Sequence, residues 1–73
     1  MTENRFYALI SRTTPTLVEF YATWCGPCRE MQTILEDLER TMRTRADVIR
    51  IDTDSPENGD LTRQHRIMSV PTF

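Results

Sequence analysis

Two cysteines, Cys25 and Cys28, are the residues of this chain with the most evident chemistry. They are its only cysteines, and two residues separate them. Thiols at this spacing can close a small disulfide ring, so the pair can alternate between dithiol and disulfide and exchange with other disulfides. The spacing alone leaves metal binding open, because half of a zinc site has the same C-x-x-C pattern.

A metal site needs more ligands than the cysteine pair supplies. Structural zinc takes four ligands, and the one histidine, His65, would raise the number offered by the pair to three. A metal site shared between two copies of the chain, or a pair of inert cysteines, would also fit the pattern. We expect no metal and no bound cofactor.

The cysteines lie where a strand is expected to meet a helix. Thr16–Ala22 is β-rich and apolar on both faces, which predicts a central strand. Pro27 suits the first turn of the helix that follows. The N–H groups and dipole at a helix N-terminus favour an anion, here a thiolate, which is the reactive form of cysteine. Five apolar residues at helical spacing are expected to form the core face of this helix: Met31, Ile34, Leu35, Leu38 and Met42.

The other segments predict a small α/β domain built around one right-handed βαβ unit. Glu3–Ile10 has apolar residues at helical spacing, and Asp47–Asp52 reads as a second strand, parallel to the first. Thr53–Gly59 is rich in turn residues. Asp60 is expected to cap a short helix over Leu61–Arg66.

Composition limits the class of protein and its partners. A formal net charge of −2 argues against a nucleic-acid partner. The first twenty residues lack the basic and apolar regions of a signal peptide, and no apolar run reaches membrane-spanning length. We therefore expect a cytoplasmic protein without a membrane partner, with its thiols mostly reduced at rest.

The residues around the pair suggest an order of events. Cys28 falls inside the first helical turn, so Cys25 is expected to be the more exposed, attacking thiolate and Cys28 the resolving thiol. Gly26 is expected to allow a tight turn without a Cβ clash, and Pro27 to stiffen the ring. Trp24 is expected to form an apolar lip beside the sulfurs.

Three segments of the chain resemble the thioredoxin family. They are Val18–Cys28, which reads VEFYATWCGPC, the strand end at Ile51–Asp52, and Ile67–Phe73, which reads IMSVPTF. The resemblance covers roughly residues 16 to 73 and implies a thioredoxin-like fold. It also implies a cis peptide bond before Pro71, which would pack beside the two sulfurs.

The resemblance assigns further site residues. Val70 would bind an extended substrate segment through strand-like hydrogen bonds, with Trp24, Gly26, Pro27 and Pro71 completing the substrate-binding surface.

Two of the implied site residues depart from the family pattern. Glu19 stands where the family usually has a buried Asp that helps move the proton of Cys28; the alternative is a polar residue tolerated at a strand end. Arg50 stands where the family usually has a Lys. It would pair with Glu19 and hold it ionised, or simply be exposed on the strand. Arg29 stands where the family commonly has a basic residue and is expected to be a surface charge.

The family fold continues beyond the V-P-T segment with a hairpin and a final helix. Residues 1–73 are therefore expected to form a single, incomplete thioredoxin-like domain. We expect a monomer if the functional protein is longer. If the functional chain has only 73 residues, a swapped dimer would be needed to complete the sheet.

The function that the resemblance implies is reduction of protein disulfides by dithiol–disulfide exchange. Its partners would be disulfide-containing proteins and a separate NADPH-dependent flavoprotein reductase. Two different functions would use the same surface. One is that of a thioredoxin-like binding or regulatory module without turnover, and the second is that of a disulfide oxidase or isomerase.

Overall fold

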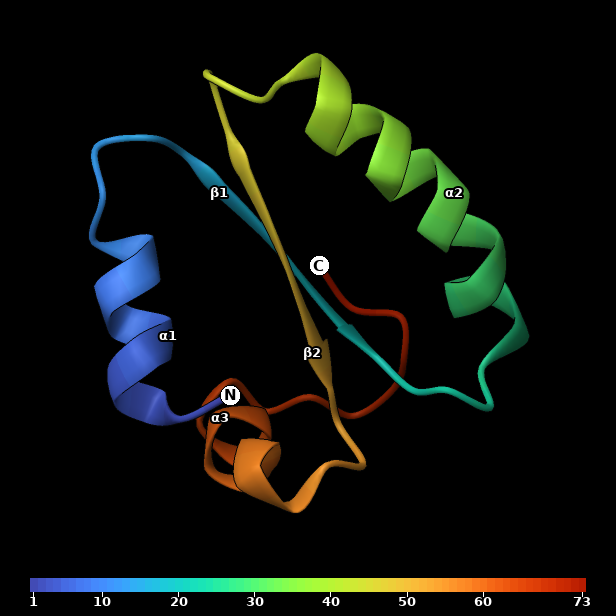
Figure 1. Cartoon of the computed structure of the whole chain (residues 1–73). Helices are drawn as coiled ribbons and strands as arrows, with labels where there is room; N and C mark the ends of the chain where they lie inside the picture. Colours follow the sequence, from blue (N-terminus) through green and yellow to red (C-terminus); the bar gives the residue numbers. More distant parts are fainter.

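Two parallel strands form the centre of the structure, a computed structural model that describes all of residues 1–73. The elements in chain order are α1 (Glu3–Ile10), β1 (Thr16–Tyr21), α2 (Gly26–Thr41), β2 (Asp47–Asp52), the 3₁₀-helix η1 (Pro56–Asn58) and α3 (Gly59–Gln64). Figure 1 shows α2 on one side of the strand pair and α1 and α3 on the other. None of these helices has both the length and the apolar character that a membrane span requires.

β1 has neighbours on both of its edges, as the prediction of a central strand requires. It pairs with β2 in parallel register, from Thr16 opposite Asp47 to Tyr21 opposite Asp52. On its other edge, Phe20 and Thr72 form an isolated antiparallel bridge. The Phe20 N–H donates to the Thr72 carbonyl at 2.8 Å, and the Thr72 N–H donates back at 3.1 Å. The bridge fixes the last residues of the chain against the strand that leads to the cysteines.

The main hydrophobic core lies on one face of the strand pair. It is formed by five buried side chains from α1, both strands and α3: Phe6, Phe20, Ile49, Ile51 and Leu61. Alternate residues of a strand point to opposite faces, so Glu19 and Arg50 point away from this core. The sheet therefore has one apolar face and one face with charged residues at its centre.

The predicted core face of α2 is only partly buried. Leu35 is 3% exposed, but Ile34 and Leu38 are 57% and 39% exposed, so their assignment to the core was wrong. Met31 and Met42 are half-buried. Adjacent strands lie about 5 Å apart, so a two-stranded sheet covers only the row of α2 side chains directly above it.

This contrast predicts unequal costs for two neighbouring truncations. Leu35→Ala is expected to lower the free energy of unfolding by about 2–4 kcal/mol, because it leaves a cavity in a packed site. Ile34→Ala, its matched control, is expected to cost less than about 1 kcal/mol, because that side chain is already exposed. Denaturant unfolding of both variants measures the difference. Equal costs would contradict this account of α2 packing.

The segment after β2 folds differently from its prediction. The predicted turn contains η1, which continues directly into α3, so this helix begins at Gly59 and ends at Gln64. Asp60 was wrongly predicted as the cap: it lies in the first turn and pairs with Arg63. Asn58 precedes the helix and is buried, and its side-chain amide donates to the Asp52 carbonyl at 2.8 Å. This contact ties the start of α3 to the end of β2.

Candidate functional site

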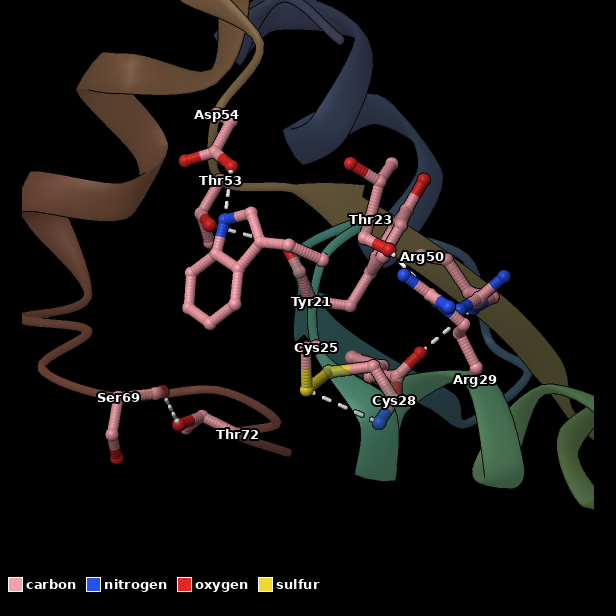
Figure 2. The surroundings of a disulfide bond; sticks show 12 residues. Tyr21, Thr23, Cys25, Cys28, Arg29, Arg50, Thr53, Asp54, Ser69 and Thr72 are labelled. Carbon is pink, nitrogen blue, oxygen red and sulfur yellow. Dashed lines mark hydrogen bonds and ion pairs between the residues drawn. A yellow bond between two sulfur atoms is a disulfide. The ribbon is translucent and has the colours of Figure 1, made fainter.

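Cys25 and Cys28 are joined in a disulfide at the N-terminus of α2, with their Cα atoms 5.2 Å apart. Cys25 is the N-cap residue, Pro27 lies in the first turn, and the Cys28 N–H donates to the Cys25 Sγ at 3.1 Å (Figure 2). The first N–H groups of a helix have no partner within the helix. In the dithiol form the same N–H and the helix dipole would stabilise a thiolate on Cys25.

Both cysteines are buried. Cys25 is 4% exposed and Cys28 is 1% exposed, so the predicted order is correct but the difference is small. They form a small cluster with Ala22, against which Tyr21 and Val70 pack. Exposure therefore does not by itself assign different roles to the two thiols, which differ more clearly in that Cys25 is the N-cap residue of α2.

The predicted cis bond before Pro71 is present, and the residue before it, Val70, packs against the cysteine cluster. Figure 2 shows Ser69 and Thr72, which flank these two residues, on the Cys25 side of the disulfide. Neither the N–H nor the C=O group of Val70 takes part in a backbone hydrogen bond. Both groups are available to pair with an extended segment of another molecule.

Trp24 directly precedes Cys25, and its indole is hydrogen-bonded to a residue outside the predicted site. The side chain is 66% exposed, and its Nε1–H donates to the Asp54 Oδ2 at 2.7 Å. Asp54 was not among the predicted site residues. A signal for it existed: the carboxyl ends of parallel strands meet at one edge of a sheet, and these two residues follow β1 and β2.

Gly26 differs from its expected role. It is the first residue of α2, with no positive φ, and a Cβ added there would meet no atom within 4 Å. The prediction that the turn needs glycine to avoid a clash was wrong, because helical backbone accepts a side chain on its exposed side. Gly26 and Pro27, the two residues between the cysteines, are both exposed.

Glu19 and Arg50 form the predicted ion pair. They are directly opposite in the parallel register, and the Arg50 Nε donates to the Glu19 Oε1 at 2.7 Å. Glu19 is fully buried and the Arg50 side chain is 25% exposed, so neither a tolerated strand-end residue nor a simply exposed arginine describes them. The guanidinium also lies over the Tyr21 ring, 4.2 Å from its centroid.

The second carboxylate oxygen of Glu19, Oε2, is buried and takes no part in the ion pair with Arg50. Oε2 has no hydrogen-bond partner, and leaving a buried charged oxygen unpaired is costly. Arg50 lines a pocket whose wall also contains Cys28. Arg50 and Cys28 therefore border the same pocket, and the ion pair lies on the sheet face opposite the main core.

The side chains present no ligand set for a metal. No group of three or more His, Cys, Asp or Glu residues is arranged to hold a metal ion. His65, considered above as a third ligand, lies among aromatic rings instead, with its ring centroid 5.6 Å from that of Phe6 and 5.7 Å from that of Phe20.

Known proteins match the whole chain. The family model described as Thioredoxin matches residues 1–73. Thioredoxin-1 of Drosophila melanogaster is 39% identical over 74 residues, which cover 99% of this chain and 67% of that protein. The bifunctional thioredoxin reductase/thioredoxin of Mycobacterium leprae is 36% identical over 74 residues, or 100% of this chain and 16% of that protein.

A solved structure agrees with the fold. Chloroplastic thioredoxin z superimposes with a TM-score of 0.85 at 39% identity, over 97% of this chain and 62% of that one. The chain thus spans about two thirds or less of the length of these relatives. The family model, the relatives and the cis-proline disulfide site agree, and the chain belongs to the thioredoxin family.

Proposed function

We propose that the protein is a thiol–disulfide oxidoreductase that reduces disulfides in other proteins. One observation carries the proposal: the Cys25–Cys28 disulfide caps α2, with the Cys28 N–H directed at the Cys25 sulfur. That position supports a stabilised thiolate on Cys25 and a resolving thiol within bonding distance. The family membership supports the same chemistry.

The reaction has two exchange steps. The Cys25 thiolate attacks one sulfur of the substrate disulfide, forms a mixed disulfide and releases the other substrate sulfur as a thiolate, which takes up a proton. Cys28 then loses its proton and attacks the Cys25 sulfur. The mixed disulfide breaks, the second substrate sulfur leaves as a thiolate and takes up a proton, and the Cys25–Cys28 disulfide forms. The substrate gains two electrons from the cysteine pair and two protons, one matched by the proton that Cys28 releases and one from solvent.

Glu19 is the proposed proton acceptor for the second step. It is fully buried, its Oε2 has no hydrogen-bond partner, and its partner Arg50 lines a pocket together with Cys28. Arg50 bonds only the other oxygen, Oε1. Positioning by Arg50 thus leaves one oxygen of Glu19 ready to receive the Cys28 proton.

The substrate is proposed to bind as an extended segment along Val70. The free backbone groups of Val70 would pair with it, and Pro71 keeps this residue against the disulfide. Trp24, Gly26 and Pro27 supply exposed surface around the sulfurs.

Turnover needs a donor of two electrons. We propose that a separate NADPH-dependent flavoprotein reductase supplies these electrons. The Mycobacterium leprae relative, whose name joins thioredoxin reductase and thioredoxin, supports such a pairing. A reducing compartment suits this cycle, so we propose a cytoplasmic location.

Trapping tests the proposed order of the two cysteines. With the full gene product, Cys28→Ser is expected to accumulate mixed disulfides with a reducible protein substrate, because the first step proceeds and the second cannot. Cys25→Ser, the matched control, is expected to trap none. Non-reducing electrophoresis and intact mass of the adduct measure the result. Equal trapping by both variants would contradict the order, and binding of the substrate without any adduct would favour a module without turnover.

The redox potential separates a reductant from an oxidase or isomerase. Equilibration with a glutathione buffer is expected to give a potential well below that of the glutathione pool, near the roughly −270 mV typical of thioredoxin. A potential near that of the pool or above it would contradict reduction as the function.

A further inference from the structure

A pocket beside the disulfide has two arginines in its wall. It has a volume of about 380 Å³ and is lined by Tyr21, Ala22, Thr23, Cys28, Arg29, Gln32 and Arg50. Arg29 follows Cys28 in α2, and Arg50 comes from the middle of β2. In Figure 2 these two arginines lie on the Cys28 side of the disulfide, whereas Ser69 and Thr72 lie on the Cys25 side.

Both guanidinium groups are held by their Nε atoms. The Arg29 Nε donates to the Thr23 carbonyl at 3.0 Å, and the Arg50 Nε donates to the Glu19 Oε1 at 2.7 Å. The Tyr21 ring supports the Arg50 guanidinium from one side. Neither arginine uses a terminal Nη group in a hydrogen bond or ion pair. The terminal Nη groups of both arginines are therefore free to donate hydrogen bonds to a ligand in this pocket.

The pocket is positively charged although the chain is not. No acidic residue is among its seven lining residues, whereas the whole chain has a net charge of −2. Glu19 neutralises one guanidinium from below, but it is fully buried and presents no charge to the pocket. One positive charge and the free Nη donors thus face the opening.

We propose that this arginine pocket, Arg29 with Arg50, binds a side-chain carboxylate of the substrate protein close to the disulfide that is being reduced. The inference rests on the proposed function and adds a substrate preference to it. Val70 packs against the cysteine cluster and Cys28 lines the pocket, so a substrate cysteine that reaches the disulfide brings its flanking residues close to the pocket. The planar fork of an arginine fits a carboxylate with two parallel hydrogen bonds.

Matched peptide disulfides test the preference. Each pair would have Glu or Gln at one of the two positions on either side of the attacked cysteine and would otherwise be identical. At one or more of these positions, the wild-type protein is expected to reduce the Glu peptide with a kcat/KM roughly tenfold above that of the Gln peptide, as a charge-assisted hydrogen bond would give. Raising the salt concentration is expected to reduce this ratio, because the pocket is open to solvent.

Charge reversal identifies the arginine responsible. Arg29→Glu is expected to bring the Glu/Gln ratio below one, whereas Arg45→Glu, which changes an exposed arginine in the turn between α2 and β2, is expected to keep the wild-type ratio. Equal kcat/KM for Glu and Gln peptides at all four positions, or an unchanged ratio in Arg29→Glu, would contradict the proposed carboxylate site. Neither result would contradict the proposed reduction of disulfides. Failure of the wild-type protein to reduce any of the peptides would overturn the proposed function, and the pocket with it.

Discussion

Cys25→Ser is expected to slow protein disulfide reduction by at least about a thousandfold, because a serine hydroxyl forms no thiolate and the remaining thiol, Cys28, is buried inside the first turn of α2. The Cys25 side chain is 4% exposed, and serine is close to it in size, so the variant is expected to fold normally. The assay is the reduction of insulin with a dithiol as electron donor, and the turbidity of the precipitating insulin chains reports its rate.

The reduced wild-type protein is the control for folding, compared by circular dichroism and by thermal unfolding. Residual turnover above a few per cent in Cys25→Ser would show that another group can attack the substrate. The N-cap position of Cys25 would then have no special role in the first step.

Glu19→Gln is expected to slow the second step, resolution by Cys28, by roughly a hundredfold, the contribution typical of a general base. The amide fits the same buried space and accepts a hydrogen bond from Arg50, but it cannot take a proton. An aromatic disulfide that releases one coloured thiolate in each step separates the two events. The first phase is expected to stay close to wild type, and the second to be delayed.

Glu36→Gln is the matched control, because this carboxylate is exposed on α2 and bonds only Gln32. Both of its phases are expected to match the wild type. Two unchanged phases in Glu19→Gln would make Glu19 a structural partner of Arg50 and would remove it from the proton path.

Much of this site could be predicted from the sequence because its determinants are local. Cys25, Pro27 and the strand before them fix the disulfide at the helix N-terminus through capping and backbone geometry. The contact of Glu19 with Arg50 came from the family resemblance, and the parallel register that places them opposite each other agrees with it. The cis bond before Pro71 came from the family resemblance, since spacing alone does not specify it.

The parts that were missed depend on tertiary contacts. The exposure of Ile34 and Leu38 depends on how wide a sheet α2 covers, which helical periodicity does not report. Asp54 was missed because its partner, Trp24, is thirty residues away on another strand end. Arg29 was expected to be a plain surface charge, and it is exposed, but its Nε contact with Thr23 orients it toward the pocket.

Alternate side chains of β1 face different parts of the molecule, so mutations at alternate positions are expected to affect different properties. Val18 and Phe20 face the main core, whereas Glu19 and Tyr21 face the side of the redox pair and Arg50. A protein engineer could therefore repack the even-numbered positions for thermostability while the odd-numbered positions keep the reactivity constant. Natural variation can follow the same division, so that a lineage adjusts to a new temperature and to a new set of client proteins through separate, interleaved residues of one strand.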